Sequence, residues 1–251
     1  MKNNLAIPTA IIIAGLIIGG AVYFSGKYNS VPEPDDQAAA EETQEQTIKA
    51  FAVRINDHIL GNPKAEISYF IYTDLECPFC RNFHSTIRQI AEDYAKQGKL
   101  KIIFKHFPLS SIHPNAEKFA ESAECAAEIG GESKFWDYVD KLVELNINEV
   151  SKVAEEVGLD KLSFEECLNS GKYAQKVAQD FEDGVNAGVQ GTPHSIIVKS
   201  DQSYPISGAL PYILEDIQFF QMLNKNQKDF MCLKDTQICG IKIAIDNLLS
   251  I

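Results

Sequence analysis

The sequence predicts an α/β fold in which a block of helices interrupts one sheet domain, and three observations support this. Residues 67–73 and 100–107 are short apolar runs rich in β-branched and aromatic residues, which indicates buried strands. Residues 78–96 between them carry apolar side chains at helical spacing, so the three segments form a βαβ unit with parallel strands. About 75 residues of helical pattern then precede the next strand-like run, residues 194–198.

Turn residues mark the remaining parts of the sheet. Residues 48–54 are predicted to form a first edge strand, and the glycine and proline within residues 61–63 mark a turn into the strand at residues 67–73. Residues 194–198 continue the sheet, with residues 204–206 as an antiparallel partner. The segment after Leu210 is predicted to be helical with an irregular middle.

The interrupting block, at about residues 113–188, is predicted to contain five helices. Pro114 opens the first, and the Gly130-Gly131 pair separates it from the second. Ser163, three residues before Glu166, predicts a capping box at the start of the fourth. The third and fifth helices are predicted over residues 149–157 and 172–184.

The motif Cys77-Pro78-Phe79-Cys80 lies where a predicted strand meets a predicted helix. Pro78 suits the first helical position, where its missing N–H is no loss, so Cys77 falls at the N-cap. Unpaired backbone N–H groups and the helix macrodipole stabilise negative charge there, which lowers a thiol pKa and favours the nucleophilic thiolate. Cys80 lies one turn on, close enough to attack a mixed disulfide formed at Cys77. The motif predicts a redox-active cysteine pair.

A zinc half-site and an inert structural disulfide are the alternative interpretations of this motif. Four-ligand zinc sites usually contain a second closely spaced Cys or His pair, and the other four cysteines form no second C-x-x-C. His84 is a possible third ligand but is equally consistent with a solvated helix residue. His106 and His113 lack the spacing of a metal set, so we predict no metal site. Both are interpreted as structural, with modulation of the thiolate by either one as the alternative.

The amino terminus predicts the compartment. Residues 5–24 contain no charge and are long enough to cross the hydrocarbon core of a bilayer. Lys2 precedes this segment, and after Lys27 only acidic charges occur before Lys49, which favours a cytoplasmic amino terminus and an extracytoplasmic remainder. We predict an uncleaved signal anchor, a single transmembrane helix over residues 1–24, with a cleaved signal peptide as the alternative.

Composition defines the rest of the domain organisation. Residues 25–47 are acidic and nearly free of large apolar groups, so we predict a disordered linker, followed by a folded domain over residues 48–251. The formal net charge of −12 argues against nucleic-acid binding, which requires basic patches. Six cysteines, an even number, suggest pairing in an oxidising compartment.

Five separated motifs stand out along the folded part: Leu60-Gly61-Asn62-Pro63, residues 74–80, residues 104–109, His113-Pro114-Asn115-Ala116 and Gly191-Thr192-Pro193. Together they resemble the thioredoxin superfamily, and within it the DsbA-like disulfide oxidoreductases with a helical insertion. The resemblance covers about residues 48–212. It implies a thioredoxin-like fold, protein thiol–disulfide oxidoreductase activity and no cofactor.

The resemblance also implies roles for individual residues. Pro193 would be a cis-proline against the cysteines, and Thr192 would offer backbone hydrogen bonds to an extended substrate peptide, beside Pro78 and Phe79. An ordinary trans proline before a strand is the alternative. Relatives often bridge the helical block as Cys125 and Cys167 would. The remaining pair, close in sequence, then suggests a second structural disulfide, Cys232–Cys239.

Two positions depart from the family pattern. Members often carry an acidic residue six positions before the first cysteine, where this chain has Ile71; Asp74 or Glu76 could substitute, although a solvated loop charge is the simpler interpretation. Strongly oxidising members have His where this chain has Phe79. Because a phenyl ring provides no charge to stabilise the thiolate, we predict a lower reduction potential than in His-containing members, measurable by redox titration.

These observations predict an extracytoplasmic, membrane-anchored thiol oxidase that introduces disulfides into exported proteins at an exposed Cys77 sulfur. The resemblance implies two partners, exported client proteins with free thiols and a quinone-linked oxidase in the membrane. The catalytic domain would lie on the periplasmic or cell-surface side of the cell membrane. A disulfide reductase or isomerase of the same compartment, and a non-catalytic membrane-tethered peptide-binding or chaperone module, are the alternative functions.

Overall fold

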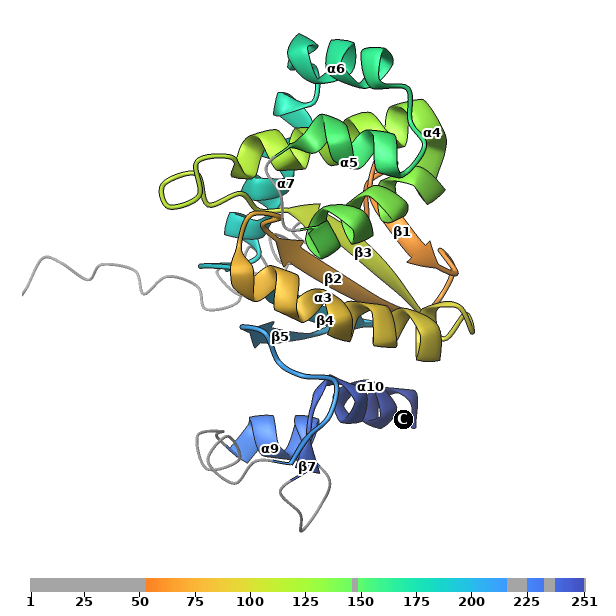
Figure 1. Ribbon diagram of the computed structural model, residues 1–251. Helices are drawn as coiled ribbons and strands as arrows, with labels where there is room; N and C mark the ends of the chain where they lie inside the picture. Colours follow the sequence, from red (N-terminus) through yellow and green to blue (C-terminus); the bar gives the residue numbers. More distant parts are fainter. Residues whose placement is uncertain (1–52, 146–148, 216–224, 233–237, 251) are drawn as a thin grey trace, which may run out of the picture. The chain divides into compact units, whose positions relative to one another are not determined.

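A five-stranded mixed sheet organises the computed structural model, which describes residues 53–145, 149–215, 225–232 and 238–250 (Figure 1). These residues all belong to one compact unit, Gln46–Ile251. The strands at residues 67–73 and 100–106 are parallel, as expected from the crossover helix between them, and the other pairings are antiparallel. From edge to edge the strands are β1 (His58–Gly61), β3 (Leu100–His106), β2 (Ile67–Thr73), β4 (His194–Lys199) and β5 (Gln202–Ser207).

The first edge strand lies later in the chain than the sequence predicts. β1 pairs with β3, with His58 opposite Phe104, whereas Val53 and Arg54 belong to no strand and residues 48–52 lie outside the described ranges. Gly61 ends the strand with a φ of 105°. A Cβ at this position would lie 2.7 Å from the Leu100 carbonyl oxygen, so a glycine is required where β1 ends against the sheet.

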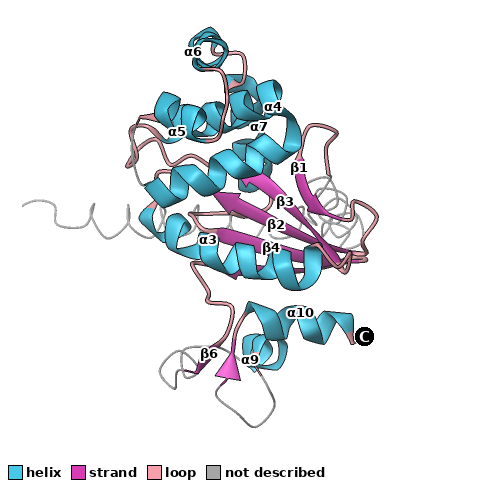
Figure 2. Cartoon of the chain, turned by 45° about the vertical axis from the view of Figure 1, so that its right-hand side comes forward, coloured by secondary structure: helices cyan, strands magenta, loops and turns pink. Residues whose placement is uncertain are grey.

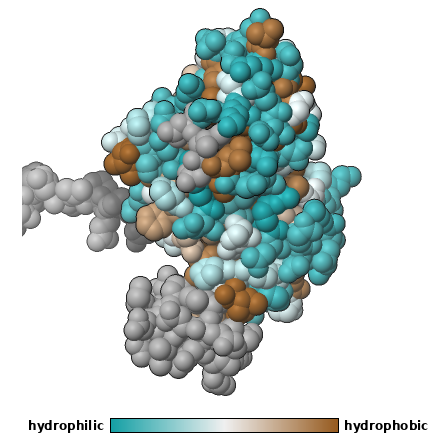
Figure 3. All heavy atoms as spheres, viewed as in Figure 1, coloured by the Kyte–Doolittle hydropathy of each residue, from teal (hydrophilic) through white to brown (hydrophobic). Residues whose placement is uncertain are grey.

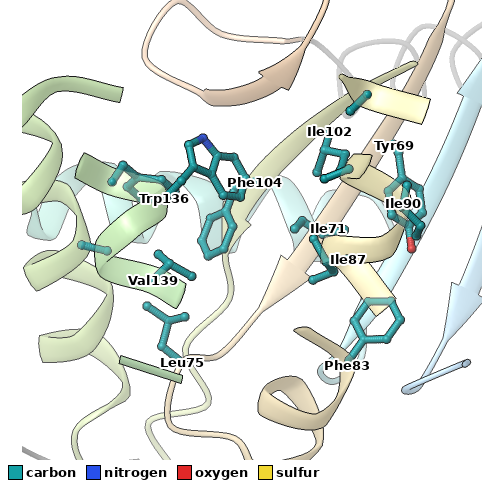
Figure 4. Close-up of a cluster of buried hydrophobic side chains, with 14 of the residues drawn as sticks. Tyr69, Ile71, Leu75, Phe83, Ile87, Ile90, Ile102, Phe104, Trp136 and Val139 are labelled. Carbon is teal, nitrogen blue, oxygen red and sulfur yellow. The ribbon is translucent and has the colours of Figure 1, made fainter. Parts of the chain in front are cut away.

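Helix α3 (Pro78–Ile90) covers one face of the sheet and continues as a π-helical turn, η1 (Ala91–Ala95). Its apolar stripe of Phe83, Ile87 and Ile90 is buried, because helical spacing aligns these side chains toward the strands. Figure 4 shows them beside residues of β2 and β3, with Trp136 and Val139 completing the same cluster. This packing fixes the start of α3, and with it the C-x-x-C motif, against the sheet.

Four helices lie between β3 and β4 and form the insertion: α4 (Ala116–Leu145), α5 (Val150–Glu156), α6 (Lys161–Ser170) and α7 (Ala174–Asn186). At Gly131 the backbone is non-helical, with φ 77° and ψ −174°, so α4 is kinked where the sequence predicts a boundary between two helices. The prediction of a capping box at Ser163 is wrong. Helix α6 begins earlier because the Asp160 side chain accepts the Ser163 N–H at 2.9 Å.

Helix α7 packs against the second face of the sheet. Phe181 of α7 stacks on Phe107, with ring centroids 4.4 Å apart. Gly184, one turn further, allows close contact, since a Cβ there would lie 2.5 Å from the Phe107 ring. Helix α7 of the insertion therefore forms a layer on the second face of the sheet. The other helices of the insertion, α4, α5 and α6, are grouped together in Figure 1.

The C-terminal part adds β6 (Leu214–Glu215), α9 (Lys225–Met231), β7 (Ile238–Cys239) and α10 (Ile241–Leu249) (Figure 2). Helix α10 joins the main core through Ile241, Ala244, Ile245 and Leu248. The Tyr94 hydroxyl donates a hydrogen bond to Asp246 Oδ1 at 2.6 Å. The last helix is thus anchored to the element that follows α3.

The predicted anchor at residues 1–24 and the predicted linker at residues 25–47 lie outside the described ranges. Within those ranges, no helix has the length and apolar character needed to cross a bilayer. Hydrophilic residues cover most of the described surface in the view of Figure 3, and hydrophobic residues occur there in separate small groups. Scattered apolar residues of this kind are normal on a protein surface.

Two disulfides cross-link segments within the described residues. Cys125 on α4 is bonded to Cys167 on α6, and Cys232 at the end of α9 is bonded to Cys239 on β7. Both pairs correspond to those inferred from the sequence.

Replacing both cysteines of the first pair by alanine is expected to lower the free energy of unfolding by about 3–4 kcal/mol, because the bond closes a long loop of the unfolded chain. The bonded residues are 42 positions apart in this pair and 7 apart in the second. The matched Cys232→Ala/Cys239→Ala variant should therefore lose less, about 2 kcal/mol. Denaturant unfolding under oxidising conditions measures both, and an equal or reversed order would contradict the loop-length argument.

Candidate active site

Cys77 is the N-cap of α3, in extended conformation with φ −66° and ψ 123°. Pro78 occupies the first turn, and no side chain caps the helix. The Cys77 N–H donates to the Asp74 carbonyl at 3.1 Å, while the Cys77 carbonyl accepts the Arg81 N–H at 3.1 Å. The sulfur is therefore held at the positive end of a helix whose first N–H groups are free to stabilise it.

The two thiols ionise very differently. A hydrogen bond from the Cys80 thiol lowers the pKa of Cys77 to about 5, although burial opposes this, and the backbone N–H groups of Cys80 and Phe79 act in the same direction. Burial, followed by its hydrogen bond to Cys77, raises the pKa of the Cys80 thiol well above its usual range. The pair therefore consists of one thiolate and one thiol at neutral pH.

The prediction of an exposed Cys77 sulfur is wrong. Cys77 retains only 3% of its surface and Cys80 4%, because the thiol of Cys77 lies 3.7 Å from the Thr192 carbonyl oxygen across from the helix. Phe79, between the two cysteines, is the exposed large apolar side chain at this end of α3, at 67%. The apolar surface that a partner would meet first is therefore the ring between the two cysteines.

The loop before β4 completes the site. The peptide bond between Thr192 and Pro193 is cis. The Thr192 hydroxyl is buried and has no hydrogen-bond partner of ordinary geometry among the described residues. A cavity of about 340 Å³ lies beside this loop, lined by residues 188, 190–194, 207 and 208. The structure thus places Cys77, Cys80, Thr192 and Pro193 together, with Pro78 and Phe79 exposed at the rim.

Asp74 and Glu76 are held by hydrogen bonds rather than solvated, which corrects the simpler interpretation of the sequence. Asp74 is 1% exposed and accepts the N–H groups of Glu76 at 2.8 Å and Leu109 at 2.9 Å. Its Oδ2 also lies 2.7 Å from His113 Nδ1. Ile71, by contrast, is a buried core residue. The buried acidic residue nearest the cysteines in sequence is therefore Asp74.

A second cluster of charges, absent from the sequence predictions, lies between the sheet and α7. Lys105 is 1% exposed, and its Nζ lies 2.5 Å from Asp57 and 3.4 Å from both Asp180 and Asp183. Arg54 pairs with Asp183 at the border of this cluster. Lys105 and His106 inside the apolar run 100–107 were the available sequence signal, since two adjacent ionisable residues interrupt an otherwise apolar strand end.

His106, Glu124 and Asp180 have ligand atoms within 4.8 Å of one another, the spacing of a possible metal site. However, the Lys176 ammonium lies 3.0 Å from Glu124 and 2.8 Å from Asp180. It provides the positive charge that these carboxylates require, and burial lowers the pKa of His106. The arrangement fits a buried ion-pair network rather than a metal centre.

A sequence model of the family described as Thioredoxin matches residues 54–207. The chain belongs to the thioredoxin family. Among solved structures, this thioredoxin-family chain is similar to alpha-DsbA1 of Wolbachia pipientis, with 26% identity, a TM-score of 0.54 and coverage of 63% of this chain and 83% of that one. BdbD of Bacillus subtilis shares the fold, with 22% identity, a TM-score of 0.51 and coverage of 62% and 85%.

A curated relative, Na(+)/H(+) antiporter NhaA 3 of Salinispora tropica, is 34% identical over 141 residues, which are 55% of this thioredoxin-family chain and 21% of that protein. The chain thus spans about a fifth of the length of the curated relatives it matches. The structural neighbours show a mixed α/β, thioredoxin-like fold of the DsbA-like thiol–disulfide oxidoreductases. The helices α4–α7 form the insertion within it.

Proposed function

We propose that this chain is an extracytoplasmic thiol–disulfide oxidoreductase that introduces disulfides into exported proteins through Cys77 and Cys80. One observation carries the proposal. At the start of α3 a cysteine with a strongly lowered pKa lies beside one with a raised pKa, and both face the cis Thr192–Pro193 peptide. This asymmetry suits disulfide exchange, in which one sulfur must leave easily and the other must stay protonated until it reacts.

The reaction begins from the Cys77–Cys80 disulfide. A client thiolate attacks Cys77 Sγ, the bond between the cysteines breaks, and Cys80 leaves and takes up a proton. A second client thiolate then attacks the client sulfur of the mixed disulfide, and Cys77 leaves as a thiolate, which its low pKa stabilises. Two electrons pass from the client to the cysteine pair, which ends as a dithiol.

Reoxidation of the dithiol needs an external oxidant, and we assign this role to a quinone-linked oxidase in the membrane. The uncharged segment of residues 5–24 supports attachment of the chain to the same membrane, with the folded domain on the periplasmic or cell-surface side. Two disulfides outside the motif support an oxidising compartment.

A reductase or isomerase of the same compartment is the second candidate, and one observation favours it. Phe79 is exposed and uncharged, so it offers the Cys77 thiolate none of the stabilisation that makes a disulfide strongly oxidising. A less oxidising pair would remain reduced in the cell and would pass electrons to client disulfides instead of taking them.

Trapping in living cells tests these functions. Rapid alkylation reports whether the pair is oxidised or reduced. A Cys80→Ala variant accumulates mixed disulfides between Cys77 and clients because Cys80 is no longer present to attack Cys77 Sγ and release the client. A mostly oxidised pair with trapped clients is the expected result. A mostly reduced pair with trapped clients would assign the reductase or isomerase function, and the absence of trapped clients would indicate a non-catalytic binding module.

A further inference from the structure

His113 lies in the loop after β3 and contacts Asp74, and the backbone of Asp74 contacts both cysteines. Its Nδ1 lies 2.7 Å from Asp74 Oδ2, and its side chain is only 17% exposed. Asp74 in turn contacts the motif through its backbone, since its carbonyl accepts the Cys77 N–H at 3.1 Å and its N–H donates to Cys80 Sγ at 3.5 Å. The residue that carries this buried carboxyl group therefore contacts both cysteines through its backbone.

The loop that carries His113 is fixed to the same turn. Glu76 accepts the Asn115 N–H at 2.6 Å and the Asn115 amide at 2.9 Å, and Leu109 donates to Asp74 from the other side. These contacts on both flanks hold the loop, and with it the backbone of His113, against the turn that carries Asp74.

An unbalanced carboxylate at this position would oppose ionisation of Cys77, because like charges at short range destabilise each other. Phe79, which lies inside the motif, offers no compensating charge. The groups that face His113 are Asp74, Glu76 and Cys77, and all are anionic when ionised. Although burial opposes it, the hydrogen bond to Asp74 and these charges raise the pKa of His113.

We propose that His113 is a positioning residue for thiol–disulfide exchange: paired with Asp74 as an imidazolium, it neutralises the buried carboxylate beside the cysteines and thereby keeps Cys77 ionised. The inference rests on the proposed function in that Cys77 is the leaving sulfur. Coupling between charges is reciprocal, so the interaction by which the Cys77 thiolate favours the imidazolium equally favours the thiolate.

Ultraviolet titration of the Cys77 thiolate in the reduced full chain tests this role. The His113→Gln variant is expected to raise the pKa of Cys77 by about one unit. It should make the disulfide about tenfold less oxidising against glutathione, or about 30 mV. The Asp74→Asn/His113→Gln variant should recover most of both shifts, because it removes the carboxylate together with its counter-charge. A purely structural role for His113 would leave the double variant as impaired as the single one.

His84 provides a matched control. Its Nε2 lies 2.6 Å from Asp140 Oδ1, and its side chain is 12% exposed, so His84→Gln removes a similar pair from α3. This variant should leave the pKa of Cys77 unchanged. NMR titration of His113 in wild-type and Cys77→Ser protein adds a measurement that does not depend on folding of His113→Gln, and reciprocity requires a lower pKa of His113 in Cys77→Ser.

The two proposals fail in different ways. An ordinary pKa for Cys77 in the wild-type chain, together with no exchange activity, would refute the proposed function. Normal exchange in the wild-type chain, with the pKa of Cys77 unaffected by His113→Gln and that of His113 unaffected by Cys77→Ser, would overturn only the role of His113.

Discussion

At pH 6, iodoacetamide is expected to alkylate Cys77 at least about tenfold faster than Cys80. With a pKa of about 5, about 90% of Cys77 is thiolate at this pH, against about 0.1% for a thiol with a pKa near 9. The less basic thiolate is intrinsically about sixtyfold weaker as a nucleophile, which leaves a net advantage above tenfold. The raised pKa of Cys80 widens the difference.

Single-cysteine variants measure this difference. Cys80→Ser leaves only Cys77 and keeps a hydroxyl that donates to it, while Cys77→Ser leaves only Cys80. The two residues are almost equally shielded, at 3% and 4% exposure, so access does not favour either one. The rate at Cys77 should level off by pH 7, whereas the rate at Cys80 should keep rising tenfold per pH unit. Parallel profiles for the two variants would contradict the assignment of the thiolate to Cys77.

The ionisation of Cys77 also determines how the stability of the reduced form depends on pH. The pKa of Cys77 in the folded protein lies below the ordinary thiol value, so its contribution to stability is complete above the ordinary value. That contribution is lost as the pH falls toward 5. Because the oxidised form has no such thiolate, ionisation of Cys77 stabilises the reduced form selectively and makes the disulfide a better oxidant.

The sequence predicts the site more completely than it predicts the surroundings of the site. The position of Cys77 follows from Pro78 and the apolar spacing of α3, which are local features. The position of the edge strand does not follow from local features. Strand β1 is only four residues long and pairs on one side, so its sequence pattern is weaker than that of residues 48–54. Asp160 instead of Ser163 caps α6 for a similar reason, since both residue types suit an N-cap.

Buried charges were the hardest feature to predict. Asp74 and Lys105 are the residue types most often found at a surface, and all of their described side-chain partners except Glu76 lie 35 or more positions away in the chain. No local pattern indicates that a carboxylate will be enclosed, because the enclosure depends on which helix packs there. The interruption of an apolar strand by Lys105 and His106 is the feature of the sequence that points to polar partners in this part of the sheet.

Replacement of Lys105 by methionine is expected to lower the free energy of unfolding at pH 7 by about 3–5 kcal/mol. The substitution keeps the length of the side chain but removes the ammonium shared by Asp57, Asp180 and Asp183, so buried carboxylates lose a counter-charge. Lys101→Met is the matched control on the same strand. Its Nζ donates only to the Ala65 carbonyl among the described contacts, so the expected loss is about 1 kcal/mol.

The loss in Lys105→Met should also depend on pH. Burial raises the pKa of Asp57 even though Lys105 opposes it, so removal of the ammonium raises this pKa further. A carboxyl whose pKa is higher in the folded than in the unfolded state favours the folded state at low pH and opposes it as the pH rises. The difference between variant and wild type should therefore shrink from pH 7 to pH 5 in denaturant unfolding. A difference that stays constant or grows on acidification would show that the carboxylates do not depend on Lys105 for their charge.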